Sequence, residues 1–261
     1  MKAIILAAGQ GTRLKKYTEN LPKGMLEFMG KTLIERQILA YREVGINDII
    51  IVKGFAQEKI AYEDVKYYIN EDYASTNMVY SLLKANKEFD DDIVISYSDI
   101  IFEKNMLNKL INNKHEFSFM VDDNWKKYWK LRYGRIDFDT ESLTINSKNE
   151  VINIGLENPL LNEIDSRYVG LLKFRSGALK TISNIYHQDF DEYKDKPWKQ
   201  SGRNILNAYM TDLIQAVIEK GHKVYAERYN HGWLEFDTNE DYEKAIQWAK
   251  DSELKELIKL D

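Results

Sequence analysis

The chain has 261 residues, of which 44% are hydrophobic and 30% are charged, an ordinary composition for a globular protein. Its formal net charge of −5 disfavours general nucleic-acid binding, and the absence of cysteine excludes a disulfide framework and thiolate zinc sites. No run approaches the ~20 apolar residues of a membrane span, and the N-terminus lacks the zones of a signal peptide. We therefore expect a soluble cytoplasmic protein that binds neither nucleic acid nor membrane.

The first half of the chain alternates predicted strands with predicted helices. The strands are expected at 2–6, 48–53, 65–70, 92–97 and 117–121. The helices are expected at 32–43, 75–87 and 105–113. Thr32 and Glu35 form a capping box for the first of these helices and Gly45 ends it, while Ser75 or Thr76 caps the second. Strand–helix repetition with short connections predicts a doubly wound α/β sheet with right-handed crossovers.

After Asp122 the pattern changes. Residues 125–154 hold short alternating stretches and turn residues, which predict a small antiparallel insertion. The remaining predicted elements are a core strand at 167–174, helices at 176–186, 205–220 and from 239 onward, a strand at 223–227, and a polar surface loop at 189–203. Without an internal repeat or a linker, we expect one domain over 1–261 with a mixed, mainly parallel sheet.

A glycine loop follows the first strand. Gly9-x-Gly11-x-Arg13 offers free backbone N–H groups and a guanidinium to a polyphosphate, and Lys23 follows after Pro22. The loop is not the dinucleotide fingerprint, because Leu14 stands where that motif needs its third glycine. It is not a Walker A loop either, since no Gly-Lys-Ser/Thr closes it. The pattern therefore indicates a different class of phosphate-binding enzyme.

Carboxylates accompany this loop. Asp99 follows the fourth predicted strand, so it reaches the same sheet edge as the glycine loop. Glu235 and Asp237 lie in a late strand-like stretch, where Asp237 is a second candidate Mg²⁺ ligand or an N-cap for the last helix. Trp129 is either a core ring or a face for a cationic ligand. The four histidines show no metal-ligand spacing.

The loop and Pro22-Lys23 resemble the signature of the nucleoside-triphosphate transferases that build activated sugars and alcohols. More narrowly, the chain resembles the small cytidylyltransferases that act on phosphocholine, on phosphonates such as 2-aminoethylphosphonate, and on phosphoglutamine. The narrower resemblance rests on segments that span most of the chain: 70–81, 95–99, 128–133, 168–174 and 233–237. It implies a Rossmann-like nucleotidyltransferase fold with a nucleotide-binding half at 1–122 and an acceptor-binding half at 123–261.

The resemblance also implies roles for individual residues. Arg13 and Lys23 would be catalytic, and Asp99 and Asp237 would hold Mg²⁺. The implied nucleotide-binding residues are Leu6, Ala7, Ala8, Gly9, Gly11, Thr12, Arg13, Lys23, Thr76, Asn77 and Ser98. The candidate acceptor-binding residues are Asp122, Trp129, Arg132 and Glu235.

One position departs from the family pattern. Many relatives carry a second lysine near the acceptor phosphate, where this chain has Asn158. Acceptor recognition must then use another cation, such as Arg132 or Arg135, or follow the phosphocholine-type arrangement.

The resulting prediction is a Mg²⁺-dependent enzyme that transfers CMP from CTP to a small phosphomonoester or phosphonate and releases pyrophosphate. One alternative keeps the fold but uses UTP or dTTP with a sugar 1-phosphate. Another is a nucleotide-binding regulatory domain without catalysis. The acceptor and the oligomeric state are left open by the sequence.

Overall fold

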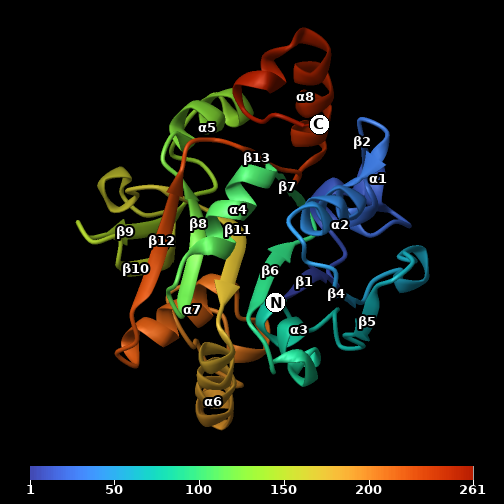
Figure 1. The fold of residues 1–261 in the computed structure, drawn as a ribbon. Coiled ribbons are helices and arrows are strands. Elements are labelled where there is room, and N and C mark those ends of the chain that lie inside the picture. Colours follow the sequence, from blue (N-terminus) through green and yellow to red (C-terminus); the bar gives the residue numbers. More distant parts are fainter. Residues whose placement is uncertain (261) are drawn as a thin grey trace.

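A seven-stranded sheet forms the centre of the computed structural model, which describes residues 1–260 (Figure 1). Its order is β12-β8-β11-β6-β1-β4-β5. The strands are β1 (Lys2–Ala7), β4 (Ile49–Lys53), β5 (Lys66–Ile69), β6 (Ile93–Tyr97), β8 (Phe117–Asp122), β11 (Arg167–Phe174) and β12 (Val224–Tyr229). Strand β11 runs antiparallel to both of its neighbours, whereas all other adjacent pairs are parallel. The predicted mixed, mainly parallel sheet is confirmed.

Helices cover both faces of this sheet. Alternate residues of β1 explain why: Ala3 and Ile5 are buried in one core, and Ile4 and Leu6 in the other. One core includes residues of α2 (Leu33–Glu43), α4 (Lys104–Asn112), α5 (Trp125–Tyr133) and α8 (Asn239–Asp251). The other includes residues of α3 (Met78–Lys84), α6 (Ser176–Tyr193) and α7 (Met210–Glu219). A one-turn helix, α1 (Lys15–Thr18), follows the glycine loop. Within residues 1–260, no helix combines the length and apolarity needed to cross a membrane.

The largest difference from the sequence-based prediction lies after β8. Residues 125–133 form helix α5 rather than part of an antiparallel insertion, because Trp125, Tyr128, Trp129 and Arg132 recur at helical spacing and are all buried. The predicted insertion is confined to the hairpin of β9 (Glu141–Ile145) and β10 (Val151–Glu157).

Three boundaries also differ. Asn77, rather than Ser75 or Thr76, caps α3, with its side chain accepting a hydrogen bond from the Met78 backbone. Helix α6 extends through the first part of the predicted 189–203 loop, where Asp189 accepts a hydrogen bond of 2.9 Å from the Trp198 indole. Helix α7 begins at Met210, after a separate short 3₁₀ turn at Ile205–Asn207.

Two short strand pairs lie outside the central sheet. Strand β7 (Ile100–Phe102) pairs antiparallel with β13 (Trp233–Glu235), and β2 (Glu27–Phe28) pairs with β3 (Lys31–Thr32). In the first pair, Glu235 stands opposite Ile100. This register brings the residues just after β13 beside those just before β7, and so connects two distant parts of the sequence.

Candidate active site

The glycine loop is held in a fixed shape at the end of β1. Gly11 has a φ of 65°, and a Cβ there would lie 3.1 Å from the Cβ of Lys23. The Thr18 hydroxyl donates a hydrogen bond of 3.1 Å to the Gly11 carbonyl, which closes the loop. Lys23 then begins a 3₁₀ turn directly after Pro22. The result is that the Lys23 side chain lies against the loop.

Two carboxylates converge on the Lys23 ammonium. Its Nζ lies 2.7 Å from Asp99 and 2.5 Å from Asp237. The carboxylates meet because the Phe236 backbone N–H donates to the Asp99 carbonyl at 2.9 Å, in continuation of the β7–β13 pairing. The Arg13 guanidinium also pairs with Asp237. Since Thr238 accepts the capping hydrogen bond from Asp241, Asp237 is not the N-cap of α8 and its carboxylate remains in this cluster.

The charged groups of this cluster shift the pKa values of Lys23 and Asp237. Burial opposes the charged form of Lys23, but Asp99 and Asp237 outweigh it and raise the pKa of the ammonium. Burial also opposes ionisation of Asp237, yet Lys23 and Arg13 lower the pKa of that carboxyl. These shifts favour the charged forms of Lys23 and Asp237 at neutral pH.

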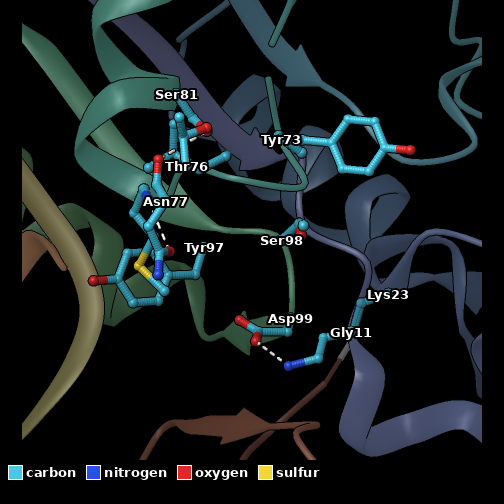
Figure 2. Close-up of a pocket in the computed structure, with 13 residues that line it drawn as sticks. Gly11, Lys23, Tyr73, Thr76, Asn77, Ser81, Tyr97, Ser98 and Asp99 are labelled. Carbon is cyan, nitrogen blue, oxygen red and sulfur yellow. Dashed lines mark hydrogen bonds and ion pairs between the residues drawn. The ribbon is translucent and has the colours of Figure 1, made fainter. Parts of the chain in front are cut away.

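A cavity of about 150 Å³, here called the loop cavity, lies between the glycine loop and the start of α3. Figure 2 shows Thr76, Asn77 and Ser81 gathered on one side of it and Lys23 with Asp99 on another. The predicted nucleotide-binding residues that line it are Leu6, Ala8, Gly9, Gly11, Lys23, Thr76, Asn77 and Ser98. The other lining residues are Asp99, predicted as a metal ligand, and Tyr73, Met78, Ser81 and Tyr97, for which no role was predicted. Ala7 is buried in the core instead.

A buried amide fixes the Thr76–Asn77 side of the loop cavity. Asn70 is fully buried, and its side-chain NH₂ donates to Thr76 at 3.0 Å and to Ser81 at 2.9 Å. Its amide oxygen accepts from the backbone of Asp72 at 3.1 Å. Thr76 and Asn77 are therefore presented by a satisfied polar network rather than by a free loop.

A second cavity, of about 530 Å³ and here called the wide cavity, adjoins the first. Lys23, Met78, Tyr97 and Asp99 line both cavities, so the two share a wall, and together they are called the cleft. The charged lining residues of the wide cavity are Arg13, Lys23, Asp99, Asp139, Glu141, Glu157, Arg167, Arg203, Glu235 and Asp237. The carboxylate–lysine cluster thus stands where the two cavities meet.

Most charges of the wide cavity are paired with one another. Arg13 lies 3.6 Å from Asp139, and Arg203 lies 3.9 Å from Glu157. Burial raises the pKa of Glu141 to about 7, although the nearby Arg167 charge acts in the opposite direction. Burial likewise raises the pKa of Glu235 against the field of Arg132. The part of the cavity around Glu141 and Glu235 is thus poorly solvated, so electrostatic contacts with a ligand are stronger there than at the exposed side chains of Arg13 and Glu157.

Three of the predicted acceptor-binding residues do not line the cleft. Asp122 is fully buried and accepts hydrogen bonds from the backbone of Asn124 and His231 and from the Trp233 indole. Its contacts hold the chain that enters β13. Trp129 is buried in the core, where its indole donates to the Phe138 carbonyl at 2.8 Å.

Arg132 is the third, and it lies behind the cleft wall. Its guanidinium makes two hydrogen bonds of 2.7 Å to Asp241, and it pairs with Glu235, the one member of this predicted set that lines the wide cavity. Arg132 therefore orients Glu235 and the start of α8. Arg135, the other cation considered for the acceptor, is exposed and pairs with Asp137 at 2.6 Å.

We expect Arg132→Ala to lower the free energy of unfolding by about 3–5 kcal/mol, because Asp241 would remain buried without its partner. Urea denaturation measures this loss, with Arg135→Ala as the exposed control. A loss below about 1 kcal/mol, the usual value of an exposed pair, would contradict this account of Arg132.

The donor set of the cluster fits a hard divalent cation. Asp99 and Asp237 both pair with the Lys23 ammonium. In addition, Oδ1 of Asp99 is buried without a hydrogen-bond partner among residues 1–260. Nowhere in that range do three or more acidic, histidine or cysteine side chains cluster as a complete metal cage. A pair of carboxylates is the protein share expected for Mg²⁺, which takes its other ligands from phosphates and water.

The fold and the two cavities, with a lysine and two carboxylates where they meet, are those expected of an enzyme that acts on a phosphorylated ligand. Comparison with known proteins identifies the same class of enzyme. Residues 3–131 match the family described as the MobA-like NTP transferase domain. The chain is 34% identical over 258 residues to a CTP:phosphoglutamine cytidylyltransferase of Campylobacter jejuni, covering 95% of this chain and 100% of that protein.

Two further comparisons concern Streptococcus pneumoniae. A choline-phosphate cytidylyltransferase from this organism is 40% identical over 152 residues, which are 57% of this chain and 65% of that protein. The solved structure of its CTP:phosphocholine cytidylyltransferase matches with a TM-score of 0.73 at 26% identity, over 95% of this chain and 98% of that one. The chain therefore belongs to the nucleotidyltransferase family, within its group of cytidylyltransferases.

Proposed function

We propose that the chain transfers CMP from CTP to a small phosphomonoester or phosphonate acceptor, with Mg²⁺ as cofactor and pyrophosphate as the second product. The observation that carries this proposal is the shared boundary of the two cavities at Lys23 and Asp99. A nucleotide in one cavity and an acceptor in the other would meet at this boundary. The similarity to the CTP:phosphoglutamine cytidylyltransferase of Campylobacter and to the CTP:phosphocholine cytidylyltransferase of Streptococcus supports the choice of nucleotide.

In this proposal the glycine loop holds the triphosphate through its backbone N–H groups, and Thr76 and Asn77 lie near the base. An oxygen of the acceptor's phosphoryl group attacks the α-phosphorus, and the bond to pyrophosphate breaks. Lys23 and Arg13 stabilise the negative charge that develops during this exchange. Asp99 and Asp237 would hold Mg²⁺, which neutralises phosphate charge when bound.

The acceptor would enter through the wide cavity, most of whose lining residues belong to the proposed acceptor-binding half, 123–261. Asn158 lines this cavity with a left-handed φ of 53°, and in this proposal it stands, without charge, where many relatives carry the second lysine. Arg167 and Arg203 are the additional cations of the cavity. They replace Arg132 and Arg135 as the candidate acceptor-binding cations.

Pyrophosphate release by the purified protein tests the proposal. CTP, UTP and dTTP would be combined with Mg²⁺ and with phosphocholine, 2-aminoethylphosphonate, a hydroxyalkylphosphonate, phosphoglutamine and glucose 1-phosphate. We expect turnover with CTP and at least one of the four non-sugar acceptors. Turnover restricted to UTP or dTTP with the sugar phosphate would overturn the choice of substrates. Tight CTP binding without any turnover would instead identify a binding module.

A further inference from the structure

Arg167 is a cation of the wide cavity whose guanidinium forms no hydrogen bond and no ion pair with the residues that the structure describes. It is the first residue of β11, and its Nε and Nη1 are buried with no hydrogen-bond partner among residues 1–260. Arg132, by contrast, directs its guanidinium to Asp241 and Glu235. Buried charged donors in folded proteins are normally satisfied, so this exception calls for a ligand that supplies the acceptor atoms.

The surroundings of Arg167 favour an oxyanion as this ligand. Its guanidinium carbon lies 4.3 Å from the ring centroid of Trp129, and that of Arg132 lies 5.1 Å from the same ring. The indole is therefore already covered by cations and offers no free face to an acceptor's ammonium group. A guanidinium placed over a ring still presents N–H groups at its edge, and these match the two oxygens of a carboxylate.

The same cavity also holds one carboxyl group without an ionic partner. Among the charged residues that line it, all within the described 1–260, only Arg167 and Glu141 take part in no ion pair. Glu141 also has no side-chain hydrogen bond to another described residue. Each lies within the electrostatic field of the other, yet they do not form an ion pair with one another. A ligand that complements both residues carries an anionic and a cationic group close together.

We propose that the wide cavity selects an acceptor whose end away from the phosphate is an α-amino acid, with its carboxylate on Arg167 and its ammonium on Glu141. The proposal rests on the function proposed above, since it assigns the acceptor for that reaction. Arg167 and Glu141 are specificity-determining residues in this arrangement, whereas the transfer itself takes place at the Lys23 cluster. Choline and aminoethyl acceptors lack the carboxylate, so they satisfy only one of the two charges.

Matched acceptor pairs test this assignment. One pair is phosphoglutamine and its analogue with hydrogen in place of the α-carboxylate, and the other is O-phospho-L-serine and phosphoethanolamine. For at least one pair, we expect the wild-type enzyme to prefer the carboxylate-bearing member by about 30-fold or more in kcat/KM. Arg167→Gln should abolish this preference, because it raises KM for the carboxylate-bearing member far more than KM for the decarboxylated member.

A second variant and a control complete the design. Glu141→Gln should lower kcat/KM for the amino-acid acceptor more than kcat/KM for the analogue of this acceptor that lacks the amino group. Arg175→Gln is the matched control, because Arg175 follows the other end of β11, is half-exposed and pairs with Asp92. We expect it to behave as the wild type. Urea denaturation of all variants separates loss of recognition from loss of folding.

Three results would overturn the assignment. The first is a wild-type enzyme with the same kcat/KM for both members of each pair, and the second is a higher kcat/KM for the decarboxylated members. The third is an Arg167→Gln variant whose kcat/KM falls by the same factor for both members. In each case pyrophosphate release from CTP with any acceptor would leave the proposed function standing. Absence of turnover with every acceptor would refute the proposed function itself.

Discussion

Lys23→Ala is expected to lower kcat for pyrophosphate release by about 100- to 1,000-fold. Lys23 is the cation at the boundary of the loop cavity and the wide cavity, and two carboxylates keep it charged and fixed. Its removal takes away positive charge at the point where negative charge develops on the transferring group. Steady-state kinetics under saturating CTP and acceptor would measure the loss.

The matched control is Lys15→Ala, since Lys15 is exposed on the same segment of chain. We expect this variant to retain activity within about threefold of the wild type. Far-UV circular dichroism and urea denaturation would show whether Lys23→Ala remains folded. A folded Lys23→Ala enzyme with full activity would contradict the role given to the lysine.

The second large effect is expected at the carboxylate pair. Asp99→Asn and Asp237→Asn should each lower kcat by about 100-fold or more and raise the Mg²⁺ concentration needed for half-maximal activity. The structural reason is that these two side chains are the only carboxylates, among residues 1–260, that contact the Lys23 ammonium. Each change would remove the negative charge of an oxygen ligand that is proposed to hold Mg²⁺, and would so weaken the binding of the cation.

A Mg²⁺ titration of activity at fixed CTP and acceptor would measure both effects. Asp195→Asn provides the control, because Asp195 is exposed on the polar loop after α6. Calorimetry of CTP binding with and without Mg²⁺ separates the loss of metal binding from a loss of nucleotide binding. An unchanged Mg²⁺ requirement in both carboxylate variants would refute the proposed metal site.

The sequence alone predicted the parts of the site that depend on local order. The glycine loop follows β1 directly, Lys23 follows Pro22, and Asp99 follows β6, so each position could be read from its neighbours along the chain. The structure brings these residues together with Asp237. Their catalytic and metal-binding roles stay predictions until the variants are measured.

The acceptor side could not be predicted in the same way. Strand β11 was predicted, but its reversed direction relative to β6 and β8 was not. This reversal is what brings Arg167, the first residue of β11, to the edge where the parallel strands end. Helix α5 was not predicted, because the short alternating stretches and turn residues within 125–154 are typical of an antiparallel insertion. Its helical spacing buries Trp129 and Arg132 behind the cleft, and Arg167 lines the cleft in front of Trp129.

The fate of the α-phosphate of CTP tests the central claim most directly. CTP labelled with ³²P at the α- or the γ-phosphorus would be incubated with the enzyme, Mg²⁺ and the acceptor that supports pyrophosphate release. Our account predicts that the α-label appears in a product that contains both cytidine and the acceptor, while the γ-label leaves as pyrophosphate. Transfer of the γ-label to the acceptor would show phosphoryl rather than cytidylyl transfer and would contradict the account.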